Sequence, residues 1–447
     1  MGQRAGMTQR SVTGNVTCLG CGCACDDIEV VVANHRIVDA RNACELGRRW
    51  FGDGQAPSAT RVDGVDVSLE QAVSSAVTRL CQAARPLVYL AAGLSCEAQR
   101  EAVAIADILR ARLDSVTSST ALLGTLAGQE RGSASATLGE LRNRADVLVF
   151  WGIDLEGRYP RFASRYAPGP PGIYVPDGRR SRTVIAVDVG RATATVDSDV
   201  RIAIEAADEL ATLTALEAFV RSPDAPRNYA SLADGVRSTA RELATALLAA
   251  RYTALVYDAE GDDRSAPRTS ARFEALVSLA QALNDRTRCA ALALRAGGNR
   301  SGADSVLVAQ TGYPCAIDFA RGYPRYVPHA GSALDALRGR DADATLVVGD
   351  PTGIPADVAA SLSTVRSVVI GPHASTAAWD AHGVVIDTGI DGIHASGTAL
   401  RTDDVPLPLR ATLPGPRSTA ETIRAVTSGI RRAVPSAHAA KHVALGS

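Results

Sequence analysis

Five cysteines near the start of the chain could bind a metal. They are Cys18, Cys21, Cys23, Cys25 and Cys44, and the first part of the pattern is C-x2-C-x3-C with Cys23 inside the loop. Cysteine thiolates are soft ligands, and a loop with this spacing can wrap one cube of iron and sulfide. Cys44 follows a short hairpin that we predict over residues 28–38. The spacing therefore favours a [4Fe–4S] cluster bound by Cys18, Cys21, Cys25 and Cys44.

Two other interpretations of this cysteine cluster stay open. A structural zinc ion is usually bound by C-x2-C pairs, whereas the second gap here is three residues. Alternatively the site is vestigial and empty, because a cysteine without a metal is simply a small buried hydrophobic residue. In a reducing compartment, clustered cysteines favour a metal site over disulfides.

Length and composition exclude several classes of protein. A chain of 447 residues is too long for one hydrophobic core, so we expect roughly two to four domains. Hydrophobic residues make up 46% and charged residues 21%, which is typical of globular proteins. The net charge of −1 argues against nucleic acid or an anionic membrane as a partner.

The sequence predicts a cytoplasmic location. Residues 1–14 are polar and rich in Gly, Ser and Thr, without the apolar core of a signal peptide. No run of about 18 apolar residues occurs, so we expect no transmembrane helix.

Short apolar strands recur along the chain and must position any site. They cover residues 87–90, 147–151, 184–187, 254–257, 345–348, 368–370 and 384–386. Continuous apolar runs indicate strands of parallel sheets that are buried on both faces. Each run is closely followed by Gly or Asp, and the carboxyl ends of such strands are where nucleotide-like ligands dock in α/β sheets. Helices are expected over residues 68–84, with Ser68 as the N-cap, and over 95–112.

These elements predict an α/β protein: a small N-terminal Fe–S-type domain followed by doubly wound, mostly parallel α/β domains. Residues 160–182 and 297–325 are rich in Gly and Pro and are expected to be long loops. The predicted segments are 1–14 (disordered N-terminus), 15–56 (cysteine-rich domain), 57–120 with 330–400 (first α/β domain), 121–329 (second α/β domain) and 401–447 (C-terminal helix and a frayed tail after Pro435).

Several motifs carry a family resemblance. The cysteine segment Cys18–Ile28 is followed by Asn42-Ala43-Cys44-Glu45-Leu46-Gly47, then Gly349-Asp350-Pro351 and Gly371-Pro372-His373. In this order they resemble the B-type subunit of formylmethanofuran dehydrogenase, of the molybdopterin/tungstopterin oxidoreductase superfamily, over about residues 16–426. The resemblance implies a pterin-bound tungsten or molybdenum that interconverts carbon dioxide and formate, a nearby [4Fe–4S] cluster, and a hydrolase-type subunit that condenses formate with methanofuran.

One departure from that family bears on the catalytic metal. The family binds its metal through a cysteine, beside a histidine, in the segment that corresponds to residues 113–122, where this chain has neither residue. Thr120 stands at the ligand position, and a hydroxyl is a poor replacement for a soft thiolate. The family has an Arg-Gly-His stretch, and Arg295 matches its arginine. This chain has no histidine there and therefore lacks that acid/base group.

We therefore expect no catalytic residue and no molybdopterin or tungstopterin. Asp188 and Arg191, which resemble the family's Val-Asp-Pro-Arg stretch, would be a vestigial pterin site. Cys96, at the start of a helix, is the best substitute ligand if the redox site survives. We expect Cys81, Cys289 and Cys315 to be core residues, and His373 and His394 to be hydrogen-bonded loop residues.

The pattern also resembles the corresponding B-type subunit of a bacterial formyltransferase/hydrolase complex in tetrahydromethanopterin-linked formaldehyde oxidation. That resemblance implies a structural and docking role in one-carbon metabolism. It also implies partners: a hydrolase-type subunit, a C-type subunit, a formyltransferase and a methanofuran-type carrier. Two alternatives remain, namely an active tungsten- or molybdenum-pterin dehydrogenase subunit, and an Fe–S electron-transfer or redox-sensing module.

Overall fold

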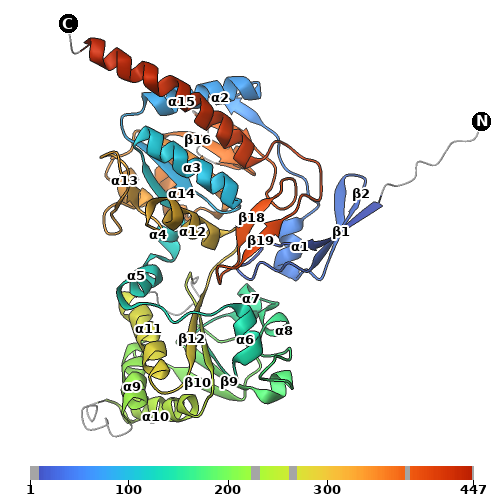
Figure 1. The fold of residues 1–447 in the computed structure, drawn as a ribbon, viewed down its shortest axis with the longest axis vertical. Helices are drawn as coiled ribbons and strands as arrows, with labels where there is room; N and C mark the ends of the chain where they lie inside the picture. Colours follow the sequence, from blue (N-terminus) through green and yellow to red (C-terminus); the bar gives the residue numbers. More distant parts are fainter. Residues whose placement is uncertain (1–9, 223–231, 261–268, 378–382, 445–447) are drawn as a thin grey trace, which may run out of the picture. The chain divides into compact units, whose positions relative to one another are not determined.

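The computed structural model describes residues 10–222, 232–260, 269–377 and 383–444. The chain forms two compact units, which are coloured along the sequence in Figure 1. The first unit contains Met1–Ser119 and Gly297–Ser447, and the second contains Thr120–Ala296. The second unit is therefore inserted into the first.

A nine-stranded sheet organises the first unit, in the order β14-β13-β7-β6-β15-β16-β17-β4-β5. Its central strands β7, β6, β15, β16 and β17 run parallel, while the strands at both ends are antiparallel. The strands are β4 (Thr60–Val62), β5 (Val65–Asp66), β6 (Pro86–Leu90), β7 (Arg112–Ser115), β13 (Ile317–Asp318), β14 (Arg325–Tyr326), β15 (Ala344–Val348), β16 (Arg366–Gly371) and β17 (Val384–Asp387).

Helices cover both faces of this sheet, as the continuous apolar strands require. On one face lie α2 (Leu69–Gln82), α3 (Cys96–Leu109), α12 (Arg300–Thr311) and α15 (Thr419–Ala444). On the other lie α13 (Ala333–Arg338) and α14 (Ala356–Leu362). Ser68 caps α2 as expected: its hydroxyl accepts from the backbone N–H of Gln71, whose side chain accepts from the backbone of Ser68.

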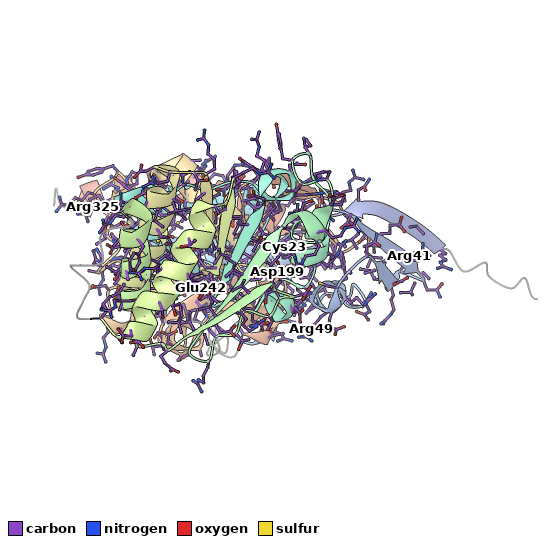
Figure 2. All side chains as sticks on the ribbon, turned by 90° about the horizontal axis from the view of Figure 1, so that it is seen from below. Cys23, Arg41, Arg49, Asp199, Glu242 and Arg325 are labelled. Atoms are coloured by element: carbon purple, nitrogen blue, oxygen red, sulfur yellow. The ribbon has the colours of Figure 1, made fainter. Side chains whose placement is uncertain are left out.

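The cysteine-rich start of the first unit is a small antiparallel sheet of β1 (Arg10–Val16), β2 (Ile28–Ala33) and β3 (Arg36–Arg41), followed by α1 (Glu45–Phe51). It appears in blue in Figure 1, and Arg41 marks its third strand in Figure 2. The two-stranded ribbon β18 (Gly397–Leu400) and β19 (Pro406–Leu409) lies against it, since the Thr17 hydroxyl donates to the Pro408 carbonyl at 2.8 Å.

The second unit has a five-stranded parallel sheet in the order β10-β9-β8-β11-β12. Its strands are β8 (Val147–Trp151), β9 (Thr183–Val189), β10 (Val200–Ile204), β11 (Thr253–Asp258) and β12 (Cys289–Leu294). The chain builds outward from β8 to β10 and then returns to place β11 on the other side of β8. The topology therefore reverses between β8 and β11, where α/β sheets usually bind ligands.

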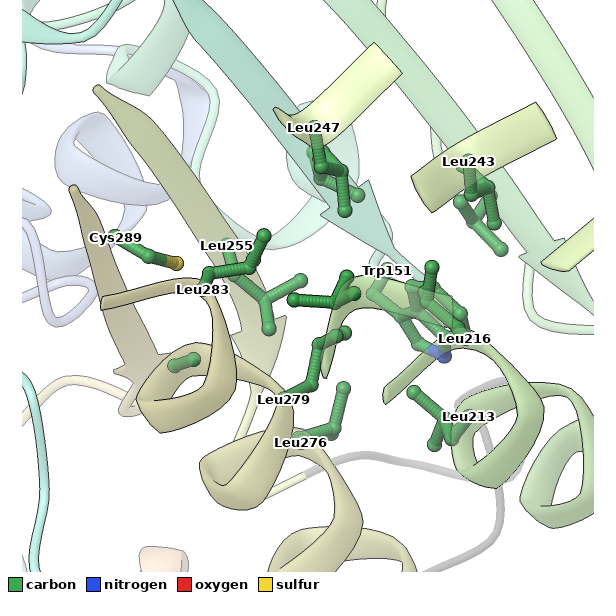
Figure 3. Close-up of a cluster of buried hydrophobic side chains, with 14 of the residues drawn as sticks. Trp151, Leu213, Leu216, Leu243, Leu247, Leu255, Leu276, Leu279, Leu283 and Cys289 are labelled. Atoms are coloured by element: carbon green, nitrogen blue, oxygen red, sulfur yellow. The ribbon is translucent and has the colours of Figure 1, made fainter. Parts of the chain in front are cut away.

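The helices of the second unit are α5 (Leu122–Arg131), α6 (Leu138–Arg144), α7 (Leu155–Arg158), α8 (Phe162–Arg165), α9 (Glu209–Arg221), α10 (Asp234–Leu248) and α11 (Ser270–Asn284). Leucines of α9, α10 and α11 pack with Trp151 and Leu255 of the sheet, as Figure 3 shows. Cys289 lies in this core, as expected, and burial raises its pKa to about 12.

The predicted segments differ from these units in five places. The predicted cysteine-rich domain 15–56 is not a separate unit, because it belongs to the first unit. Residues 297–329 belong to the first unit, because Ala303, Val306 and Leu307 of α12 pack in its core and β13 pairs with β7. The predicted loop 297–325 therefore contains α12, β13 and β14. Residues 401–434 are part of the first unit too, since Ile423 and Val426 are buried in its core.

The other two differences are at the ends of the chain. Residues 10–14, expected to be disordered, belong to β1, a polar strand that is defined by its pairing with β2 rather than by an apolar run. α15 continues to Ala444, past the predicted start of the frayed tail. Among the described residues, no helix is both long and apolar enough to cross a membrane.

Candidate functional site

The loop that carries the first cysteines is closed on itself by backbone hydrogen bonds. The backbone N–H of Cys18 donates to the Cys25 carbonyl at 2.9 Å, and that of Ala24 donates to the Cys21 carbonyl at 3.1 Å. The backbone N–H of Thr402, next to the β18–β19 ribbon, donates to the Gly22 carbonyl at 2.9 Å. The loop is therefore held between the small sheet and this ribbon.

Cys44 reaches the same place from the N-cap of α1. A side chain at Gly47 of that helix would place its Cβ 3.1 Å from the Sγ of Cys18 and 3.9 Å from the Sγ of Cys44. The two sulfur atoms thus converge over a glycine, and a larger residue there would push into them. Cys23 is fully buried beside the others, and Figure 2 labels it.

The thiols are close enough to influence one another. Burial raises the pKa of Cys18 well above its usual value, and Cys21, Cys25 and Cys44 raise it further. The Cys18 sulfur also accepts a hydrogen bond from the backbone N–H of Gly20 at 3.3 Å. Bound iron would reverse the effect on the pKa, because a metal cation deprotonates the thiols that coordinate it.

The donor set fits an iron–sulfur cluster in chemistry: thiols from one closed loop and one helix start. Within the part of the chain that the structure describes, no group of three or more His, Cys, Asp or Glu side chains has the geometry to hold a metal ion. The structure therefore brings the four predicted ligands together without a formed metal site.

The segment around Thr120 is not the predicted loop. Residues 112–115 form β7, which pairs with β6, and Thr117–Thr120 form the short helix α4. Buried Leu113 and the parallel pairing favour the strand. The side chains that follow are hydroxyls: Thr117 donates to Asp304 at 2.5 Å, and Ser118 donates to buried Asp114.

Asp114 ties this segment into the first unit. Its carboxylate also accepts from the backbone N–H groups of Ala316 at 3.0 Å and Ala333 at 2.6 Å. Burial raises the pKa of Asp114, although these hydrogen bonds oppose the effect. The carboxylate is saturated by protein donors, which assigns it a structural role.

Arg295 lies directly after β12 in the second unit and forms a buried ion pair with Glu260. Arg158, at the end of α7, pairs with Asp258 at 2.5 Å, and the Asp258 carboxylate also accepts from the backbone N–H of Glu260 at 2.8 Å. These groups follow β8, β11 and β12, the carboxyl edge where the topology reverses. Sequence reasoning retained Arg295 but missed its partner, which no local pattern marks.

The two residues predicted to form a vestigial pterin site have separate surroundings. Asp188, at the end of β9, accepts from Arg201 of β10 at 2.8 and 2.9 Å and from the backbone N–H of Ala194 at 2.7 Å. Arg191 is exposed. Asp188 therefore already has an intramolecular cation where a ligand hydroxyl would bind in a dinucleotide fold.

Cys96 does not offer a free thiolate. Its side chain is buried, burial raises its pKa, and its Sγ accepts from the Asn299 amide at 3.7 Å. Cys315 is fully buried, and Cys81 packs partly buried against the core, as expected of core residues.

Both histidines are hydrogen-bonded loop residues, as predicted. His373 Nδ1 lies 3.1 Å from the Asp350 carboxylate, which raises the pKa of the imidazole. His394 Nδ1 accepts from the Ile390 backbone at 3.0 Å, and Nε2 donates to the Gly54 carbonyl at 2.8 Å. Burial lowers the pKa of His394, which agrees with a neutral ring.

The chain is similar in sequence to the B-type subunit of archaeal tungsten-containing formylmethanofuran dehydrogenase 2. It is 30% identical over 427 residues to that subunit of Methanococcus maripaludis, covering 90% of this chain and 94% of the relative. The same subunit of Methanocaldococcus jannaschii is 29% identical over 419 residues, covering 91% and 94%. No family model matches.

Among solved structures, a chain of the formyltransferase/hydrolase complex from Methylorubrum extorquens, crystallised with methylofuran, has the same fold. The TM-score is 0.70 at 24% identity, over 84% of this chain and 100% of that chain.

Proposed function

Because the chain belongs to the family of the formylmethanofuran dehydrogenase B-type subunit, we propose that it is a non-catalytic structural subunit of a formyltransferase/hydrolase complex. Its pathway would be tetrahydromethanopterin-linked formaldehyde oxidation in the cytoplasm. The hydrolase-type subunit, the C-type subunit and the formyltransferase would be its partners. A methanofuran-type carrier would be a further partner of this complex.

The observation that carries the proposal is the chemistry of the segment after β7. A tungsten or molybdenum site in this family needs a thiolate there, and the segment has Thr117, Ser118, Ser119 and Thr120 instead. A neutral hydroxyl stays protonated near neutral pH and binds a soft metal poorly.

Two features of the described residues support the same conclusion. Cys96, the best substitute ligand, is buried and accepts a hydrogen bond from Asn299. The guanidinium of Arg295 is neutralised by Glu260 inside the protein, so the carboxylate already occupies the position of an anionic ligand. Both residues therefore stabilise the fold without needing a cofactor.

The retained cysteines favour a second candidate role. Cys18, Cys21, Cys25 and Cys44 would hold a [4Fe–4S] cluster, which when bound supplies one-electron transfer. In that role the chain would be an electron-transfer or redox-sensing module within the complex. In the first role, the cluster would only stabilise the small N-terminal sheet and the loop beside it.

Complex activity separates these functions. We expect Thr120→Ala to leave formate release from the formylated carrier unchanged in the purified complex. We also expect no reduction of methyl viologen by formate in the metal-loaded complex. Formate-dependent viologen reduction that is lost in Thr120→Ala would contradict the proposal and favour an active pterin dehydrogenase subunit.

A second comparison separates the two cluster roles. If the cluster is only structural, Cys18→Ala lowers the stability of the complex but leaves its hydrolase activity independent of the applied redox potential. An activity that follows potential in the wild-type complex, and no longer does so in Cys18→Ala, would establish the redox role instead.

A further inference from the structure

The segment between α8 and β9 presents an apolar tip to solvent. At the tip, Ile173 is 75% exposed and Tyr174 is 54% exposed. Among the large hydrophobic side chains that the structure describes, none is more exposed than Ile173. A single exposed apolar residue is common, so the question is what holds these two in place.

The tip, residues 172–175, is a tight turn with a fixed backbone. Gly172 and Val175 exchange backbone hydrogen bonds at 3.1 and 3.2 Å, and Val175 is fully buried. The backbone N–H of Tyr174 donates to the Asn143 carbonyl at 2.9 Å, and that of Ile173 donates to the Asn143 side chain at 3.3 Å. The turn is therefore fastened to the end of α6.

Gly172 shows how closely the tip lies against that helix. A Cβ at this position would lie 2.0 Å from the Arg142 carbonyl oxygen, which no side chain tolerates. Glycine is thus required for the approach of the two backbones.

One buried arginine fastens the rest of the segment. The Arg182 guanidinium donates to the carbonyls of Ala145 at 3.1 Å, Pro170 at 2.7 Å and Arg142 at 2.6 Å, and also to that of Pro168. These hydrogen bonds all go to backbone carbonyls around the turn. A surface that is already ordered loses little conformational entropy when a partner binds.

Exposed cations lie on the elements that carry the tip, along with exposed Asp177. Arg142 and Arg144 are exposed on α6, and the Arg144 guanidinium lies 5.0 Å from the centre of the Tyr174 ring. Arg180, in the same segment, is exposed as well. Arg142 and Arg180 make no ion pair with any residue that the structure describes. Arg144 has an acidic partner in Glu140, whose carboxylate oxygen lies 4.0 Å from the Arg144 Nε.

We propose that residues 172–175, with Arg142 and Arg144, are the surface through which this chain docks on another subunit of its complex. The partner surface would be an apolar recess with Asp or Glu at its rim. Tyr and Arg are enriched at the centres of protein interfaces, and here they flank an exposed apolar Ile173 on a rigid backbone. A second copy of this chain is a poor occupant, because a twofold contact would bring like-charged tips together.

This inference rests on the proposed function, since it needs a complex to dock on. The test uses the full chain and the remaining three subunits (hydrolase-type, C-type and formyltransferase), co-purified and immobilised for biolayer interferometry. We expect Ile173→Asp to raise the dissociation constant at least about 30-fold, which is the effect of a hot-spot residue. Arg142→Glu should raise the dissociation constant less, and the affinity of this variant should depend less on salt concentration than that of the wild type.

Leu210→Asp is the matched control. Leu210 is 45% exposed in the first turn of α9 of the same unit, where an aspartate favours the helix. We expect it to bind within about 2-fold of wild type, the range of a surface change. Equal melting temperatures of all variants would exclude misfolding.

Three outcomes would overturn the inference. Wild-type affinity of Ile173→Asp would refute the docking surface alone. A wild-type dimer that Ile173→Asp dissociates would assign the tip to self-association. A wild-type chain that does not bind the other subunits would refute the proposed function as well.

Discussion

The buried ion pair between Arg295 and Glu260 allows a sharp test of whether these residues of the second unit stabilise the fold rather than take part in catalysis. Their side chains are 11% and 1% exposed. Arg295→Met removes the guanidinium that pairs with the buried Glu260 carboxylate. Removing one partner of a buried pair costs about 3–5 kcal/mol, so the free energy of unfolding of this unit should fall by that amount.

A double variant makes the prediction specific. Arg295→Met with Glu260→Leu replaces both charges with apolar side chains of similar volume, and such replacements are often neutral or stabilising. We therefore expect the double variant to recover most of the stability that Arg295→Met loses. The surface variant Glu217→Gln, which breaks an exposed pair with Arg221 on α9, should cost at most about 0.5 kcal/mol.

Urea unfolding followed by tryptophan fluorescence measures these differences. Trp151 lies in the core of the second unit, so Trp50 and Trp379 would be replaced by phenylalanine to make it the only reporter. With a slope of about 2.5 kcal/mol per molar urea, the Arg295→Met midpoint should fall by about 1.5 M. Unchanged midpoints together with lost complex activity would refute the structural role and assign Arg295 a catalytic role instead.

Three further predictions follow from individual side chains. Burial raises the pKa of Asp391 to about 6, so its stabilising contribution is present below the unfolded value near about 4 and is lost as pH rises through about 6. Asp391→Asn should therefore be more stable than wild type by up to about 2–3 kcal/mol at pH 8, with no gain near pH 4; equal stability at both pH values would contradict this. Asp350 raises the pKa of His373, while the hydrogen bonds from His373 and Thr352 lower that of Asp350 despite its burial. The pair therefore stabilises the fold most between about pH 4 and 6.5, and less as pH rises through the raised pKa of His373. Asp350→Asn should lose most stability in that window. An imidazole titration by NMR that is the same in the variant and the wild type would count against the pair. Finally, Cys18→Ala should lower bound iron from about four atoms per chain to below one, while Cys81→Ala keeps it; equal iron in both would exclude the cysteine loop as the site.

Much of the fold could be predicted because its strands are continuous apolar runs. Strands such as β8 and β15 are buried on both faces, so their sequences alone mark them. The Ser68 cap of α2 was similarly local. In contrast, β1 and β10 alternate or are polar, and they are strands because a neighbour pairs with them.

The unit boundary and the charged partners were harder to predict because they depend on tertiary packing. α12 is amphipathic, but only its burial in the first core shows that residues 297–329 belong there. The ion pairs Arg295–Glu260 and Asp188–Arg201 join different elements, and the spacing of these residues in the sequence does not predict them. The cysteines predicted as cluster ligands, in contrast, lie mostly within one loop, so their proximity follows from local spacing, while their role as ligands stays a prediction.

Metal analysis of the native complex after anaerobic purification tests most directly the proposal that this chain binds no tungsten or molybdenum. We expect about four iron atoms for each copy of this chain, with neither tungsten nor molybdenum and no pterin. Tungsten or molybdenum in a one-to-one ratio to the chain, released together with a pterin, would contradict the proposed function.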